Sequence, residues 1–143
     1  MLRFDGAGIP RLRLDDHGIH EFLQCPCVEY TKYQEKEWPK YGFECQVNNS
    51  HSDWKKTGSF YDLVNVSSSP ARDNQWWTQH IIVNGNKATV KVNGTIVFEY
   101  TEPAGAQPGK DFTRKLDEGT FALQAHDPKS VIRYKNIRVK RLD

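Results

Sequence analysis

Long hydrophobic runs are missing from this sequence of 143 residues. No apolar stretch approaches the roughly 20 residues that a membrane-spanning helix needs, which excludes such a span and a membrane partner. Residues 1–16 carry a charge every few positions and have no apolar core, so they are not a signal peptide. We therefore expect a cytoplasmic chain or, if a leader was removed ahead of these residues, a periplasmic or extracellular one.

Cysteine is scarce, with three residues in the chain. Cys25 and Cys27 are separated by a single proline, which is too short a spacing for an unstrained disulfide, and Cys45 lies in an expected strand. A zinc site usually takes four ligands in C-x-x-C-type pairs, and the sequence has no such pair. We expect reduced thiols, with a bridge from Cys45 to Cys25 or Cys27 as the alternative.

A surplus of either charge is missing too, since 20 basic and 18 acidic residues leave a net charge of +2. Nucleic-acid-binding domains carry a basic patch or stripe, which this composition lacks. The basic residues of 138–141 alternate with an apolar one, as on a strand with one solvated face. The charge pattern therefore predicts no nucleic-acid partner.

Helical periodicity is absent as well, because no window of eleven or more residues shows it. Short β-branched and aromatic runs between Gly, Asn, Asp and Pro residues indicate strands instead. The clearest run is 80–98, where Asn84-Gly85 and Asn93-Gly94 predict the type I′ turns of a three-strand meander. Further strands are expected at Gly42–Val47, Thr57–Val64, Thr120–Ala125 and Val131–Leu142, the last with a bulge near Asn136.

The strand pattern predicts a single all-β domain over residues 1–143. We find no internal repeat and no low-complexity tail, and long loops are expected at the ends of the meander. Such a meander is typical of an antiparallel two-sheet sandwich or jelly roll.

Polar side chains gather on one side of the strand that follows Tyr41. Strand alternation places Glu44, Gln46 and Asn48 on one face, and Phe43, Cys45 and Val47 on the other. Sugar hydroxyl groups need paired donors and acceptors, which such a polar face supplies. An ordinary solvent-facing strand surface is the alternative explanation.

Three further segments offer groups for a ligand. Gln124 and His126 share one strand face, and a histidine can exchange a proton near neutral pH or bind a metal. Tyr61 alternates with Phe60 in the strand that follows Lys55 and Lys56. The adjacent Trp76 and Trp77 face opposite ways in a strand, so at most one stacks on a sugar, and we assign Trp77 to the ligand.

A second carboxylate is missing beside Glu44. Ordinary glycosidases use two carboxyl groups, one as general acid and the other as nucleophile or base. No acidic residue follows Glu44 in its strand, so hydrolysis by that route is not expected.

Six segments occur in the order in which similar segments occur in one known family, the 3-keto-disaccharide hydrolase domain family, once classed as a domain of unknown function. They are Tyr41–Val47, Thr57–Leu63, Asn74–Trp77 with Ile82–Asn86, Val90–Gly94, Gly119–His126 and Tyr134–Val139. The resemblance covers 41–143, whereas 1–40 match poorly and lack the arginine that relatives carry there. It implies a concanavalin A-like lectin and glucanase fold from which some N-terminal strands are missing. A second copy of the chain would then cover the exposed sheet edge.

The resemblance also implies cleavage of glycosides oxidised at the third carbon of the sugar, by hydrolysis or elimination. Carried onto this chain, Glu44 or His126 is the base or a metal ligand. Gln46, Gln124 and Lys135 orient hydroxyl groups or the developing enolate, and Asn48, Tyr61 and Trp77 complete the carbohydrate site. No cofactor is certain, and a divalent metal is compatible with this chemistry.

Two functions other than catalysis stay open from the sequence. One is a carbohydrate-binding module without turnover, which the missing acid pair and the poorly matched 1–40 favour. The other is a structural or protein-binding sandwich.

Overall fold

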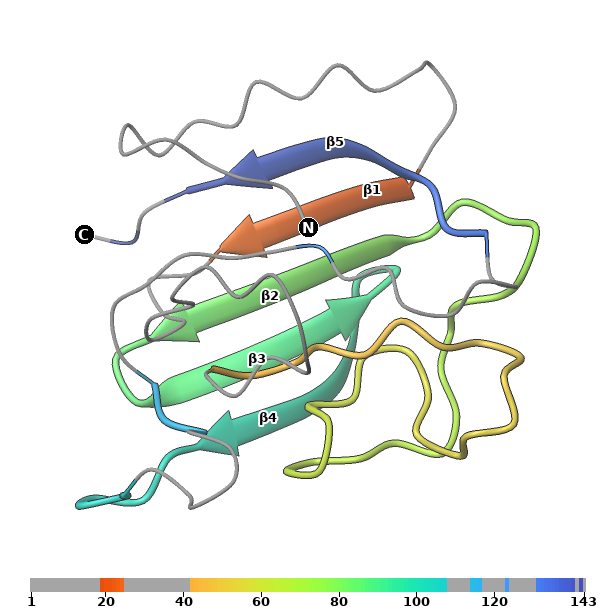
Figure 1. Ribbon diagram of the computed structural model, residues 1–143. Helices are drawn as coiled ribbons and strands as arrows, with labels where there is room; N and C mark the ends of the chain where they lie inside the picture. Colours follow the sequence, from red (N-terminus) through yellow and green to blue (C-terminus); the bar gives the residue numbers. More distant parts are fainter. Residues whose placement is uncertain are drawn as a thin grey trace, which may run out of the picture.

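The computed structural model describes residues 42–107, 114–116, 123, 131–140 and 142, together with the backbone of 19–24 (Figure 1). Five strands lie within these residues: β1 (Ile19–Gln24), β2 (Thr78–Asn84), β3 (Lys87–Val92), β4 (Thr95–Thr101) and β5 (Tyr134–Val139). This described part contains no helix, which confirms the all-β class for it. No helix long and apolar enough to cross a membrane is found there either.

The strands form a single sheet in the order β4-β3-β2-β1-β5. β2 pairs with β3, and β3 with β4, in antiparallel fashion. The meander predicted over 80–98 is therefore confirmed. Alternation is strict along β2 and β3, where every second side chain is buried.

The two Asn-Gly pairs form turns of different geometry. Asn93 and Gly94 have φ values of 51° and 79°, which agree with the predicted type I′ turn. In the first turn Asn84 still pairs with Lys87, so the loop residues are Gly85 and Asn86. Only Gly85 has a positive φ, 57°, as in a type II′ turn, so the type I′ prediction was wrong here.

β1 departs from the antiparallel arrangement that the sequence predicted. Its backbone lies between β2 and β5 and is parallel to both. Parallel neighbours cannot be joined by a tight turn and need a long crossover connection. Residues 25–77 provide this connection between β1 and β2, and a sequence pattern of local turns does not reveal it.

β5 contains the irregularity predicted near Asn136. The pairing with β1 shifts register between His20 and Phe22, which face Lys135 and Arg138. Asn136 has a φ of 54°, a left-handed value that asparagine tolerates better than most residues. The extra residue on β5 is thus a β-bulge, which confirms the prediction.

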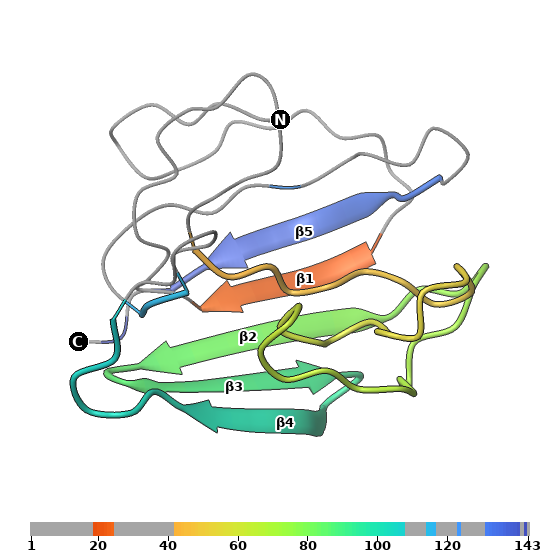
Figure 2. The same cartoon turned by 60° about the horizontal axis from the view of Figure 1, so that its bottom comes forward.

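Residues 42–66, here called the bridged layer, cover one face of the sheet (Figures 1 and 2). Isolated antiparallel bridges join Cys45 to Phe60 and Phe60 to Val64. The strands predicted at Gly42–Val47 and Thr57–Val64 are reduced to these bridges and nearby hydrogen bonds. Positive φ values at Gly58 (96°) and Asp62 (60°) interrupt a regular ladder.

The core lies between the sheet and the bridged layer. Phe60 stacks on Phe43, with ring centroids 5.2 Å apart, and meets Phe98 of β4 edge-on at 4.9 Å. The buried members of this core are Phe60, Ile81, Val83, Ala88, Val90, Phe98 and Leu116. A smaller cluster joins Ala71, Trp77 and Val92. Within the described residues one regular sheet and the bridged layer are formed, and a second regular sheet is not.

Candidate functional site

The polar face predicted around Glu44 lies on the outer side of the bridged layer. Because Cys45 bridges antiparallel to Phe60, Glu44 lies opposite Tyr61, and the Tyr61 N–H donates to the Glu44 carbonyl at 2.9 Å. In the same pairing, Gln46 lies opposite Ser59, and the Gln46 N–H donates to the Ser59 carbonyl at 2.8 Å. The alternation that places Glu44, Gln46 and Tyr61 on one side is therefore present in the structure.

The opposite side of these segments faces the core. Phe43 and Cys45 pack against the main core cluster and Val47 against the smaller one. A Cβ atom on Gly58 would approach Val97 of β4 to 2.8 Å, so this glycine lies directly against the sheet. The bridged layer thus has an apolar inner side and a polar outer side.

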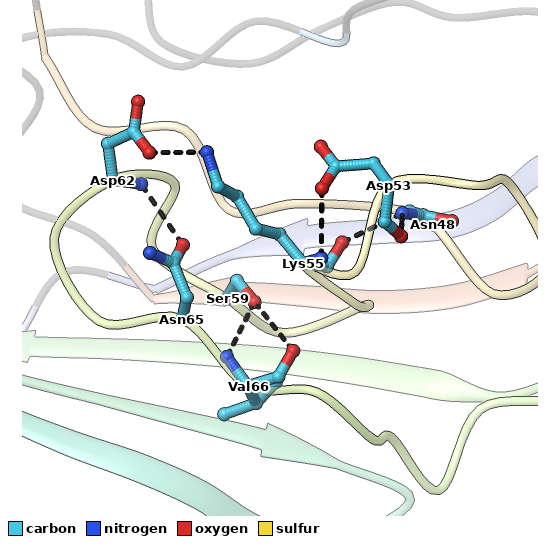
Figure 3. Close-up of polar contacts among 7 residues, drawn as sticks. All are labelled: Asn48, Asp53, Lys55, Ser59, Asp62, Asn65 and Val66. Carbon is cyan, nitrogen blue, oxygen red and sulfur yellow. Dashed lines mark hydrogen bonds and ion pairs between the residues drawn. The ribbon is translucent and has the colours of Figure 1, made fainter.

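A charged cluster borders Tyr61 on this outer side, and Figure 3 shows the ion pair of this cluster between Lys55 and Asp62. The Nζ atom of Lys55 lies 3.8 Å from the centroid of the Tyr61 ring and pairs with the carboxylate of Asp62. The hydrogen bond from Lys55 to Asp62 raises the pKa of the ammonium group, against a smaller opposing effect of burial. The Asp62 N–H in turn donates to the side-chain oxygen of Asn65, at 3.1 Å.

Asn48 is used by the fold rather than presented to a ligand. Its side-chain amide donates to the carbonyls of Asp53 and Lys55, at 2.9 and 2.8 Å, and the residue is buried (Figure 3). The loop 49–56 folds back over Asn48 at this point. The prediction that Asn48 contacts substrate is therefore not supported by its surroundings, because a loop that strand alternation cannot foresee covers it.

Arg114 is a residue that the sequence interpretation did not include. Its Nη1 atom donates to the carbonyl of Gly42 at 2.8 Å. Burial lowers the pKa of Arg114, and the nearby acidic groups of Glu44, Asp62 and Tyr61 act in the opposite direction. No local motif marks this arginine, since its contact with Gly42 spans 72 positions of the chain.

The two tryptophans have roles opposite to those assigned from the sequence. Trp77 is 5% exposed and belongs to the smaller core cluster, whereas Trp76 is 45% exposed. The assignment of Trp77 to a sugar is wrong, because residues 77, 79, 81 and 83 are the buried set that leads into β2. The sequence showed that one of the pair is buried but not which one.

Lys135 does not join the outer side of the bridged layer. Its Nζ atom lies 4.5 Å from the centroid of the Trp76 ring. In the sheet register Lys135 lies opposite His20, and His20 lies opposite Thr78. The side chain of Thr78 is on the face of β2 opposite to its buried residues. Register therefore places Lys135 on the sheet face turned away from the core, with the sheet between it and Glu44.

Gln124 and His126 lie outside the described residues, as does most of the strand predicted at Thr120–Ala125. Among the residues that the structure does describe, no group of three or more His, Cys, Asp or Glu side chains is placed to hold a metal ion.

The fold and the site together define a β-rich domain with a carboxylate, a phenol and cationic side chains on one polar surface. A family model described as the 3-keto-alpha-glucoside-1,2-lyase-like domain matches residues 18–140, so the chain belongs to this family. This confirms the resemblance carried by the six sequence segments, and the match begins ahead of the first of them. No curated protein and no solved structure matches the chain.

Proposed function

We propose that this protein cleaves glycosides oxidised at the third carbon of the sugar, by elimination across the first and second carbons, with Glu44 as the base. Membership of a family described as 3-keto-glucoside-1,2-lyase-like supports the substrate class and the bond cleaved. The observation that carries the assignment to Glu44 is its position opposite Tyr61 on the outer side of the bridged layer.

The proposed chemistry needs a single base. A ketone at the third carbon acidifies the hydrogen on the second, and the Glu44 carboxylate removes that proton. The electrons of the broken C–H bond pass into an enolate, then form a double bond between the first and second carbons as the glycosidic C–O bond breaks. The ketone is restored and the leaving oxygen takes up a proton, so an unsaturated keto sugar and a free alcohol are formed.

Gln46 and Tyr61 are the described side chains proposed to bind sugar hydroxyl groups. Both are part-buried and lie on the same side as Glu44, and the Tyr61 ring is held by Lys55. Gln124 and His126 are proposed to complete this surface, and His126 is the alternative base. We also propose that the bridged layer belongs to the second sheet of a concanavalin A-like jelly roll.

Turnover of a 3-keto-glucoside with a chromogenic leaving group tests the proposal. The full chain should release the leaving group from this substrate and not from the glucoside that was never oxidised. It should also exchange the hydrogen on the second carbon with deuterium from the solvent. E44Q should lower both rates by about 10²–10⁴-fold, the usual contribution of a general base.

H126A and K135A are the matched comparisons. If H126A abolishes exchange while E44Q does not, His126 is the base and the assignment of Glu44 is wrong. K135A should leave both rates unchanged, because Lys135 lies on the far face of the sheet. Binding of the keto sugar without exchange or release by the unaltered chain would identify a carbohydrate-binding module and overturn the proposed lyase.

A further inference from the structure

Arg114 is held at two points beside the polar side of the bridged layer. Its guanidinium donates to the carbonyl of Gly42, two residues before Glu44. Two residues after Arg114, Leu116 is buried in the main core and its N–H donates to the carboxylate of Glu102 at 2.7 Å. These two contacts place the Arg114 side chain beside the backbone segment that carries Glu44.

The groups that raise the pKa of Arg114 are residues of the candidate site. Glu44 counteracts the effect of burial on the arginine most strongly, followed by Asp62 and Tyr61. Asp62 also has Lys55 as an ion-pair partner. Arg114 therefore lies beside the segment that carries Glu44, whereas Lys55 is paired with Asp62.

We propose that Arg114 is a catalytic residue that stabilises the oxyanion formed on the ketone oxygen when Glu44 removes the neighbouring proton. This inference rests on the proposed function. As Glu44 takes the proton it becomes neutral, and the electron pair of the broken C–H bond places one negative charge on the substrate oxygen. The negative charge thus moves from Glu44 to the substrate oxygen, where Arg114 stabilises it. The total charge of the site does not change.

A fixed arginine suits this task for two reasons. A preorganised donor in a partly buried position stabilises developing charge more than water does, because it needs no reorganisation during the reaction. The guanidinium also keeps its proton throughout the pH range of enzymes, so it acts as a charge and a hydrogen-bond donor and does not compete with Glu44 as a base.

The test compares R114Q with K115Q, which removes the same charge from the next position. R114Q should lower kcat for the 3-keto-glucoside by about 10²–10³-fold, the usual effect of losing one oxyanion donor, with a smaller change in KM. It should slow deuterium exchange at the second carbon by the same factor, because the enolate is the state that is stabilised. R114K should lie between R114Q and the unaltered chain, because lysine keeps the charge but not the planar fork.

Chemical rescue separates catalysis from support of the fold. R114A should regain part of its kcat and exchange rate when millimolar guanidinium is added, whereas E44Q should not respond. Circular dichroism spectra and thermal unfolding of each variant show whether the fold is kept. A merely structural arginine would change unfolding without a response of kcat to guanidinium.

The outcomes distinguish this inference from the function on which it rests. No exchange and no release by the unaltered chain overturns the proposed function and the role of Arg114 with it. Turnover that depends on Glu44 but is kept in full by R114Q overturns the role of Arg114 alone. Slow release by R114Q with unchanged exchange does so as well, because the arginine would then act on the leaving group.

Discussion

The sheet strands β2–β4 and the bridged layer that covers them are stabilised by different interactions. β2, β3 and β4 are joined by backbone ladders, and the inner side chains of β2 and β3 are almost fully buried. The bridged layer has two isolated bridges, and side chains complete its hydrogen bonds. Thr57, for example, receives the Asn48 N–H at 2.9 Å, and Ser59 receives the Val66 N–H at 2.9 Å.

This difference assigns the stability of the fold mainly to the sheet strands and the candidate chemistry to the bridged layer. The regular strands present apolar residues to the core, and their backbone hydrogen bonds are mostly those of the ladders. The bridged layer uses polar side chains to hold its backbone, and the same segment carries Glu44, Lys55 and Tyr61 on its outer side. Irregular segments on a rigid scaffold are where binding and catalytic residues are concentrated in proteins generally.

The largest expected effect is at the contact between the two regions. G58A places a methyl group 2.8 Å from Val97 and 3.2 Å from Val92, at a φ of 96°. We expect a loss of about 2–4 kcal/mol in the free energy of unfolding, from left-handed strain and overpacking together. Urea unfolding followed by tryptophan fluorescence measures it.

G94A is the matched control for this substitution. Gly94 has a φ of 79°, and a Cβ atom there would meet nothing within 4 Å, so only strain of about 1–2 kcal/mol is expected. The difference in unfolding free energy between G58A and G94A measures how closely the bridged layer packs against the sheet at Gly58. Equal losses would show that the bridged layer does not rest on the sheet at Gly58.

A smaller effect is expected where a side chain replaces the backbone ladder. N48A removes the amide that holds the carbonyls of Asp53 and Lys55, and we expect a loss of about 1–3 kcal/mol in unfolding free energy. The exposed neighbour Ser50 provides the control S50A, which should change little. A negligible effect of N48A would contradict the view that polar side chains stabilise the bridged layer.

The smallest effect is expected on the outer face of the sheet and depends on pH. Burial, and then the charge of the cross-strand neighbour Lys91, lowers the pKa of His80. As the pH falls below about 6.5, the unfolded chain binds this proton before the folded chain does, so stability decreases. H80Q should therefore lose less stability than the unaltered chain between pH 7 and pH 5.

Thermal unfolding at a series of pH values measures this difference, and K91M provides the comparison. Removal of the lysine should raise the pKa of His80 and weaken the pH dependence without abolishing it, because burial remains. Identical pH profiles for the unaltered chain and H80Q would show that His80 titrates alike in the folded and unfolded states.

Local features of the fold could be predicted from the sequence, since they depend on neighbouring residues. The pair Asn93-Gly94 predicted a turn, and the pattern around Asn136 predicted a bulge. Strand alternation predicted the two sides of the segment around Glu44. The parallel pairing of β1 could not be predicted, because it depends on a partner that follows a long connection. The reduction of two expected strands to bridges follows from φ values at Gly58 and Asp62 that composition does not determine.

The candidate site could likewise be predicted only where its residues are close together in the sequence. Strand alternation predicted Glu44 and Gln46 on one face, whereas Tyr61 was predicted as a candidate in a separate segment. Arg114 was missed because its contact with Gly42 joins distant parts of the chain. Lys135 and Trp77 were placed wrongly because the polarity of a strand residue does not tell which face of which layer it joins.

Within the described residues, a polar contact in the core joins the sheet to the bridged layer. The Nε2 atom of the fully buried Gln79 in β2 donates to the sulfur of Cys45, at 2.9 Å. Cys45 is only partly buried, and the amide of Gln79 lies against its sulfur. Alkylation of Cys45 in native buffer should therefore become faster when the contact between Gln79 and Cys45 opens.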